Sequence, residues 1–478
     1  MAFNQHLQAL VVVFVIILLA FYVMIFHICP GKQTNDVYNS PKLRLIPTDP
    51  PASNGPCSCP KGSLVFKDHI PQDQYEKLVQ RRAKELEQHE ARTTSVLSKK
   101  LYAAPNSPLK YPIQGFTVKP LTPSAIPGLE LHAGERSNYK VTITVHKGVL
   151  NTEVPPEGVI TEGEDGDLLF IESYSLVMIN YILAQVTYTS KVYHIHTGDL
   201  AIFKFENHEA VFPITIKQPQ MPVLYDMGTD ISSHVTITTK TFLRYSNLDV
   251  LIKSIRSFYS KIPIIIADDS FDPEKITGEN IQHYIMPPAQ GWFAGRNLAI
   301  SQVTTKYLLW VDDDFVFTEK TKIEELVNIM EGVPELDVLG GSVEGKQFYF
   351  TLVYDEGQEM DGGCLLRKSN RRFLQLPGYP HCSLTSGVVN FFLARTDAVQ
   401  RVGFDPKLQR VAHSEFFMDG LGSLMVASCN HVAIGHQPRS SNKDNARYQH
   451  YRKPGKEDER FKEKLHFFKN HLKCVLFG

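Results

Sequence analysis

The pattern of apolar and polar residues divides the chain into segments with different predicted structures. Residues 9–28 are apolar and carry no formal charge, and a helix of about twenty such residues crosses a hydrocarbon core of roughly 30 Å. No small-x-small cleavage site follows this run, which favours an uncleaved signal anchor over a removed signal peptide. We therefore predict a tail at 1–8 and a transmembrane helix at 9–28.

A polar, proline-rich stem is predicted after this helix. Seven prolines lie between positions 30 and 60, a composition typical of an extended segment. A thin apolar stripe that includes Tyr75 and Leu78 predicts a helix over about 72–98. We expect this helix to be solvated, and we predict that the stem spans 29–100.

Alternating apolar and polar positions then predict short strands. Runs such as VTITV at 141–145 and FPITI at 212–216 are separated by clusters of Gly, Glu and Asp, the pattern of half-buried strands joined by turns. We predict a small β-rich domain over 101–228. It contains no residue pattern typical of a catalytic site.

From about His234 onward, strands alternate with helices. HVTITTKT predicts a first strand, residues 247–259 predict a helix, and PIIIADDS at 263–270 predicts a second strand. A second helix is predicted to begin near Arg296, and YLLWV predicts a third strand that ends before Asp312. This order predicts an α/β domain with a parallel sheet over 229–478, whose ligands bind at the carboxyl ends of the strands.

Two of these strand ends carry adjacent carboxylates, Asp268-Asp269 and Asp312 to Asp314. Like charges beside a core repel one another and lose hydration, so a compensating cation is expected. A divalent metal between these acids and a nucleotide diphosphate would satisfy both charges. The alternative for each pair is a purely local role at a strand end.

Four other residues are candidates for the site. Arg296 would fix the acids and a diphosphate, with a structural Arg–Asp pair as the alternative. Glu415 and Asp419 are four residues apart and hence on one helical face beside aromatic residues, where a carboxylate suits a general base; each also has a local structural alternative. His436 is a candidate metal ligand, although an isolated His is more often structural.

The bulk composition leaves compartment and partners open. The chain has 50 Lys+Arg and 51 Asp+Glu, so no net field suggests a nucleic acid partner. Of the seven cysteines, the six beyond Cys29 could form three disulfides in an oxidising lumen or stay reduced in a cytosol. Lys32, Lys42 and Arg44 follow the apolar run and no Lys or Arg precedes it, which weakly favours a cytosolic α/β domain.

Long blocks of the α/β segment resemble a known family. TKTFLRY, IADDS, GWFAGRNLAISQVTTKYLLWVDDDFVF, TSGVVNFFLARTD and RVAHSEFFMDGLG resemble the β-1,4-N-acetylgalactosaminyltransferases, which comprise the ganglioside GM2/GD2 synthases and the Sd(a)/Cad antigen synthases. The resemblance covers about residues 100–478. GLELHAGERSNYKVTITVHKGVLNT, RVAHSEFF, IGHQ and FKNHL look closer to the Sd(a)/Cad branch.

This resemblance implies a GT-A glycosyltransferase fold, a Rossmann-like mixed sheet, for 229–478. It implies an inverting enzyme with UDP-GalNAc as donor and Mn²⁺ (or Mg²⁺) as cofactor. It also implies a single-pass type II protein of the Golgi membrane with a luminal catalytic domain, against the weak charge asymmetry. The expected site has Asp312, Asp314 and His436 on the metal, Asp268, Asp269, Arg296, Asp312 and Asp313 on the donor, and Glu415, rather than Asp419, as the base.

The expected reaction moves GalNAc in β-1,4 linkage onto galactose of α2,3-sialylated glycoprotein or glycolipid glycans. A ganglioside GM2/GD2 synthase and an inactive membrane-anchored carbohydrate-binding protein are the alternatives. A nucleotidyl- or phosphoryltransferase with two metals at the acids is more distant, because the chain has neither a P-loop nor the kinase motifs. The β-rich domain would position acceptor or partner chain, and a homodimer is a further hypothesis.

Overall fold

The computed structural model describes residues 59–93 and 108–477, except 222, 226–227, 358–360, 370–372, 410, 413, 439–447, 449–450 and 452–454. The predicted tail and membrane helix, and the stem up to residue 58, lie outside the described residues. In the described ranges, no helix is both long enough and apolar enough to cross a membrane.

The β-rich domain consists of strands that bury every second side chain. Its elements are β2 (Leu109–Lys110), β3 (Phe116–Val118), β4 (Ser124–Ala125), β5 (Glu130–Leu131), β6 (Tyr139–Thr144), β7 (Gly148–Asn151), β8 (Val159–Glu162), β9 (Leu168–Ser173), α3 (Leu176–Leu183), β10 (Thr187–Ser190), β11 (His196–Phe205) and β12 (His208–Lys217). A six-stranded sheet has the order β3-β12-β11-β6-β9-β8, and a three-stranded sheet the order β4-β10-β7. In β6, Val141 and Ile143 are buried while Lys140 is exposed, as the period of two requires.

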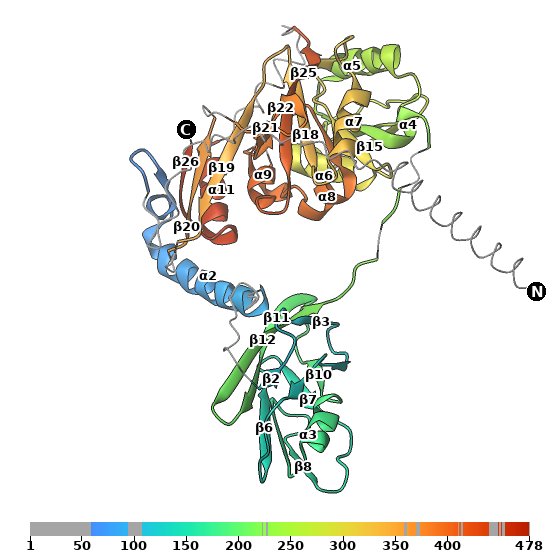
Figure 1. Cartoon of the computed structure of the whole chain (residues 1–478). Helices are drawn as coiled ribbons and strands as arrows, with labels where there is room; N and C mark the ends of the chain where they lie inside the picture. The colour runs from blue at the N-terminus through green and yellow to red at the C-terminus, as the bar shows by residue number, and fades with distance from the viewer. Residues whose placement is uncertain are drawn as a thin grey trace, which may run out of the picture. The chain divides into compact units, whose positions relative to one another are not determined.

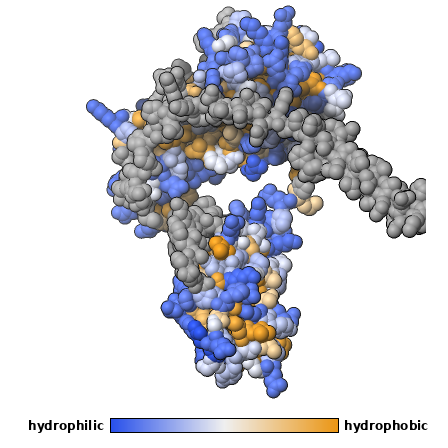
Figure 2. All heavy atoms as spheres, in the orientation of Figure 1, coloured by the Kyte–Doolittle hydropathy of each residue, from blue (hydrophilic) through white to orange (hydrophobic). Residues whose placement is uncertain are grey.

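Apolar side chains are also exposed on the β-rich domain, and Figure 2 shows patches of them on its visible face. The most exposed include Val154, Tyr174, Val177 and Tyr193. Single exposed apolar residues are ordinary on protein surfaces, so they do not by themselves define a binding site.

The α/β domain is built on a ten-stranded mixed sheet (Figure 1). Its elements in chain order are α4 (Ile231–His234), β13 (Val235–Thr241), α5 (Tyr245–Phe258), β14 (Ile264–Asp268), β15 (Ile281–Ile285), α6 (Trp292–Ser301), β16 (Tyr307–Trp310), β17 (Phe315–Val316), α7 (Ile323–Gly332), β18 (Val338–Val343), β21 (Gln375–Leu376), β22 (Tyr379–Thr385), β24 (Phe392–Arg395), α8 (Thr396–Val402), η3 (Pro406–Leu408), α9 (Glu415–Asp419) and β25 (Val426–His436). The strand order is β15-β14-β13-β16-β24-β18-β25-β22-β21, and β17 pairs with β25.

The sheet is only partly parallel. Strands β13 to β16 pair in parallel, as predicted from the alternation of strands and helices, but β24 pairs antiparallel with both β16 and β18. The alternation of strands and helices therefore describes only this part of the sheet, and the whole is the mixed sheet that the family resemblance implied. The cause is that β24 follows a long excursion of the chain and not a simple crossover helix, so right-handed βαβ geometry does not fix its direction.

Both faces of this sheet are covered, which explains its near-continuous apolar strands. In β14, Ile264 and Ile266 pack in one core with residues of α5 and α7. The intervening Ile265 and Ala267 pack in a second core with residues of α6 and α8. Alternation along one strand thus feeds two layers of helices.

A five-stranded sheet joins segments from the two ends of the described chain. It contains β1 (Leu64–Val65), β19 (Tyr349–Asp355), β20 (Gly363–Lys368), β23 (Gly387–Val388) and β26 (Leu472–Phe477), in the order β1-β26-β20-β19-β23. The sulfur atoms of Cys59 and Cys474 lie at disulfide distance, as do those of Cys382 and Cys429. A segment that we assigned to the stem is therefore part of this sheet.

The predicted stem helix is also packed against the α/β domain. Helices η1 (Phe66–His69) and α2 (Gln72–Thr93) lie against α11 (Lys456–Lys469). Leu78 of α2 is 3% exposed, and the Arg82 guanidinium donates to the backbone carbonyl of Phe467, 3.1 Å away. The interpretation of a fully solvated helix does not hold for this face of α2.

This packing predicts that Leu78→Ala destabilises the α/β domain. The substitution removes a buried side chain and should lower the free energy of unfolding by about 2–5 kcal/mol. Trp292 and Trp310 are the two tryptophans of the chain, so their fluorescence during urea unfolding reports on this domain. Lys77→Ala, at an exposed neighbouring position, is the matched control. Equal unfolding midpoints for the two variants would contradict the packing of α2.

Candidate active site

The strand order places a topological switch point between the carboxyl ends of β13 and β16. From β13 the sheet extends through β14 to β15 on one side, whereas β16 lies on the other side of β13. Such a switch point is where open α/β sheets bind ligands. Arg244 lies three residues beyond β13, and Asp312 to Asp314 lie directly beyond Val311 at the end of β16.

An ion-pair network crosses this switch point. The Arg244 guanidinium donates through Nη2 to Asp313 Oδ1 and through Nη1 to Asp314 Oδ2, the latter over 2.7 Å. Thr241 Oγ1 donates to Asp313 Oδ2 over 2.9 Å. Burial raises the pKa of the Asp313 carboxyl, and Arg244 and Thr241 oppose that rise.

Asp314 and His436 face each other across a short gap. His436 ends β25, and its backbone pairs with Phe315 of β17, directly after Asp314. Its Nε2 atom lies 3.5 Å from Asp314 Oδ2, and its Nδ1 lies 2.7 Å from the carbonyl oxygen of Gln437. Burial opposes ionisation of Asp314, but the contacts with His436 and Arg244 more than offset it and lower its pKa to about 2.

Asp312 is turned toward other partners. Trp310 Nε1 donates to its Oδ1 over 3.2 Å, and Asn390 Nδ2 donates to its Oδ2 over 3.0 Å. Burial raises the pKa of Asp312. In the part of the chain that the structure describes, the groups with three possible ligand atoms within 4.8 Å of one another are built on cysteines. The predicted set of Asp312, Asp314 and His436 is thus brought together only in its last two members.

Arg296 is a buried cation surrounded by rings. It lies in the second turn of α6 and not at the helix start, where we expected it, and it is 3% exposed. Its guanidinium carbon lies 4.5 Å from the ring centre of Trp310, and its Nη2 lies 3.9 Å from Asp312 Oδ1, which is too long for a hydrogen bond. Its Nε has no hydrogen-bond partner among the described residues. Burial lowers the pKa of Arg296 to about 10.

Asp268 is fully buried and already hydrogen-bonded by the protein. It accepts hydrogen bonds from the Tyr245 hydroxyl over 2.6 Å and from the backbone N–H of Ser270 over 2.9 Å, and His283 Nε2 lies 3.1 Å away. These contacts fit the local structural role that we set beside donor binding.

Asp269 fixes the start of α6. It accepts from the backbone N–H of Gly291, the N-cap of α6, over 2.8 Å, and its other oxygen pairs with Lys240 Nζ at 2.6 Å. Because α6 carries Arg296, Asp269 contributes to the site through the position of that helix. Contact of either Asp268 or Asp269 with a base or ribose stays a prediction.

The two candidate bases both face α11. Glu415, the first residue of α9, is 1% exposed and pairs with Lys462 Nζ at 2.5 Å. Asp419, the last residue of α9, pairs with Lys469 Nζ at 2.8 Å. These ion pairs stabilise the contact between α9 and α11. In this structure each carboxylate therefore has the structural partner that our alternative required.

Sequence reasoning missed Arg244 and Asn390. Arg244 follows a strand just as the acids do, so the rule that strand ends carry ligands could have found it. Asn390 lies in the connection between β23 and β24, where no local pattern indicates that its side chain reaches Asp312.

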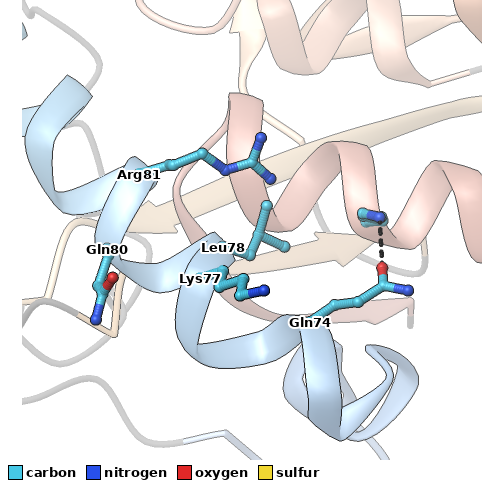
Figure 3. A pocket seen from close by; sticks show the side chains of 6 residues that line it. Gln74, Lys77, Leu78, Gln80 and Arg81 are labelled. Atoms are coloured by element: carbon cyan, nitrogen blue, oxygen red, sulfur yellow. Dashed lines mark hydrogen bonds between the residues drawn. The ribbon is translucent and has the colours of Figure 1, made fainter.

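A separate groove lies between α2 and α11. Figure 3 shows Lys77, Leu78 and Arg81 of α2 at this groove, where Lys464 Nζ donates to Gln74 Oε1 over 3.0 Å. None of the predicted site residues lines it. It is therefore not part of the switch-point site.

Comparison with known proteins supports the fold of the mixed sheet. Residues 236–398, which run from β13 into α8, match the family model of Glycosyl transferase family 2. That range contains the switch-point acids, Arg244 and Arg296, whereas Glu415, Asp419 and His436 lie beyond it. The match fits a GT-A-like glycosyltransferase fold for the mixed sheet.

Curated relatives match most of the chain. Mouse beta-1,4 N-acetylgalactosaminyltransferase 2 is 46% identical over 432 residues, which cover 87% of this chain and 84% of the mouse protein. Human beta-1,4 N-acetylgalactosaminyltransferase 1 is 45% identical over 415 residues, which cover 82% of this chain and 78% of the human protein.

Among solved structures, S. aureus TarS in complex with UDP-GlcNAc is 14% identical, with a TM-score of 0.32, over 45% of this chain and 61% of that chain. A likeness of this size supports no structural or functional conclusion. The two curated relatives support a conclusion about the family, because their identity with this chain extends over most of this chain and most of each relative. The chain belongs to the β-1,4-N-acetylgalactosaminyltransferase family and is a glycosyltransferase.

Proposed function

We propose that the chain transfers GalNAc from UDP-GalNAc in β-1,4 linkage to galactose of α2,3-sialylated glycans, the Sd(a)/Cad-type reaction. The observation that carries the donor assignment is Arg296, a buried guanidinium whose acidic partner, Asp312, lies beyond hydrogen-bond distance. A buried cation needs an anion with good hydrogen-bond geometry. The diphosphate of a nucleotide sugar at the switch point supplies one.

The pair of Asp314 and His436 fits a divalent cation. A carbonyl oxygen only accepts hydrogen bonds, so the contact with Gln437 puts a proton on Nδ1 of His436 and leaves Nε2 to face Asp314 in the neutral ring. One carboxylate and one imidazole, with the other positions left to phosphate oxygens and water, suit Mn²⁺ or Mg²⁺. When bound, the cation would stabilise the negative charge that develops on the departing UDP.

The remaining residues of the site position these groups. Asn390 and Trp310 fix Asp312 beside Arg296, so Asp312 is better placed to orient the donor than to join the metal ligands. Thr241 and Arg244 fix Asp313 at the end of β16. Because these side chains are already held before donor binds, little conformational entropy is lost when it does.

Inversion needs one general base to take the proton of the acceptor hydroxyl as it attacks the anomeric carbon. We propose Glu415, in which case the hydroxyl would replace Lys462 as its partner. The identities to the two relatives, 46% and 45%, do not separate acceptor classes. A ganglioside synthase acting on glycolipids is therefore an equal alternative.

The first test of the function is a transfer assay. With UDP-GalNAc and Mn²⁺, we expect a β-1,4-linked GalNAc product on a sialylated glycoprotein. A parallel assay with a sialylated glycolipid as acceptor distinguishes the two acceptor classes.

The metal assignment predicts that Asp314→Asn lowers the rate of transfer by roughly 10²-fold or more, as for loss of an electrostatic group at the leaving phosphate. Asp272→Asn, at an exposed position beyond β14, is the control. Near-normal transfer by a folded Asp314→Asn protein would remove the metal assignment.

The base assignment predicts a difference between Glu415→Gln and Asp419→Asn. Loss of a general base should lower kcat by roughly 10² or more with donor binding little changed, so Glu415→Gln should lose more turnover than Asp419→Asn. Lys462→Met breaks the same ion pair from the other side and controls for stability. If Lys462→Met and Glu415→Gln lower Tm and kcat equally, the role of Glu415 is structural.

We also propose a single-pass type II protein of the Golgi membrane with a luminal catalytic domain. The apolar run at 9–28 and two cysteine pairs at disulfide distance support this, because disulfides persist in oxidising compartments. The α/β domain in sealed Golgi vesicles should resist added protease until detergent opens them. Digestion without detergent would place it in the cytosol.

A homodimer, which light scattering of the solubilised protein would detect, stays a prediction.

A further inference from the structure

Arg244 binds the carboxylate oxygen that faces the candidate metal ligand His436. Asp314 Oδ2 lies 2.7 Å from Arg244 Nη1 and 3.5 Å from His436 Nε2. A divalent cation held by Asp314 and His436 would meet the guanidinium at this shared oxygen. Two positive groups at one oxygen in a partly buried site repel each other.

The two contacts of Arg244 are not equivalent. Asp313, its other partner, has a side chain that is 2% exposed, and its second oxygen is held by Thr241. Breaking that contact would strand a buried carboxylate, which is strongly unfavourable. Asp314 has a side chain that is 20% exposed and has His436 beside it. The contact with Asp314 is therefore the one that can be given up.

The surroundings of Arg244 fit such an exchange. The ring centre of Tyr448 lies 4.2 Å from its guanidinium carbon, and this cation–π contact has no fixed hydrogen-bond direction that would oppose a turn of the guanidinium. The Nε atom has no hydrogen-bond partner among the described residues. Arg244 also lies at the switch point, where a diphosphate would bind.

We propose that Arg244 is a donor-binding residue that exchanges one anion for another. Without donor it holds Asp313 and Asp314. When a divalent cation takes Asp314 and His436, the Nη1 group turns to the diphosphate of the donor while Nη2 stays on Asp313. This inference rests on the proposed function, and it makes cation and nucleotide bind cooperatively, because the diphosphate accepts the group that the cation displaces.

Titration of the full-length protein with Mn²⁺ tests this, with free Mn²⁺ measured by electron paramagnetic resonance in the absence and presence of UDP. In the wild-type protein, UDP should strengthen Mn²⁺ binding by about 5-fold or more. Arg244→Lys keeps a charge for Asp313, but one ammonium cannot span both carboxylates as the fork does. It should bind Mn²⁺ more tightly than wild type without UDP and gain less when UDP is added.

Three further proteins make the result decisive. Arg256→Lys is the matched control, because Arg256 of α5 donates to backbone carbonyls of Ile262 and Glu279 and not to the acids; it should titrate as wild type does. The double variant Arg244→Met/Asp313→Asn removes the buried pair together and leaves no charge stranded. It should also bind Mn²⁺ more tightly without UDP.

Asp314→Asn separates the two levels of the proposal. If it binds Mn²⁺ as wild type does, the metal assignment fails, and this inference with it. If it loses Mn²⁺ while the two Arg244 variants keep the wild-type affinity and the wild-type gain with UDP, the metal assignment stands and the exchange by Arg244 is overturned.

Discussion

The ion pair between Arg244 and the two acids after β16 is the constraint on which the site depends. Three consecutive carboxylates cannot lie beside a core unless cations offset them. Arg244 meets Asp313 and Asp314 from the end of β13, and β13 and β16 are neighbours in the sheet. The strand order therefore brings the compensating charge to the acids. The same order creates the switch point, the place at which open α/β sheets bind their ligands.

Helix α11 likewise brings positive charges to carboxylates, in this case those of α9. Through Lys462 and Lys469, α11 neutralises Glu415 and Asp419 of α9, and through Phe467 it receives α2. A helix that holds α9 in place also sets where the candidate base lies. Any change in α11 is therefore expected to affect the position of α9 through packing and charge together.

Local patterns predicted the parts of this protein that depend on neighbouring residues. The strands at 141–145 and 212–216 follow from periodicity, as does the order of helices and strands from His234 to Asp312 apart from β15, which was not predicted. The acids were found because strand ends carry ligands. The partners of those acids could not be predicted, since a local pattern shows which residue is charged but not which side chain lies beside it in the fold. His436 and Asp314 meet through pairing of β25 with β17, and Glu415 meets Lys462 through the packing of α9 on α11. Helix α2 looked solvated because its apolar stripe is thin, but a few apolar residues suffice to dock a helix whose other side stays in water.

The charges of the switch point also suggest an order of events. With all three acids ionised, Asp312, Asp313 and Asp314 outnumber the guanidinium groups of Arg244 and Arg296 by one. A net negative charge at the switch point would disfavour a diphosphate. Asp314 and His436 would hold a divalent cation whose charge reverses this sign, so that the site would attract the diphosphate of a nucleotide sugar. Departure of UDP together with the cation would restore the starting imbalance, and Asp314 would again need a partner. Arg244, still anchored on Asp313, is the group nearest to provide it.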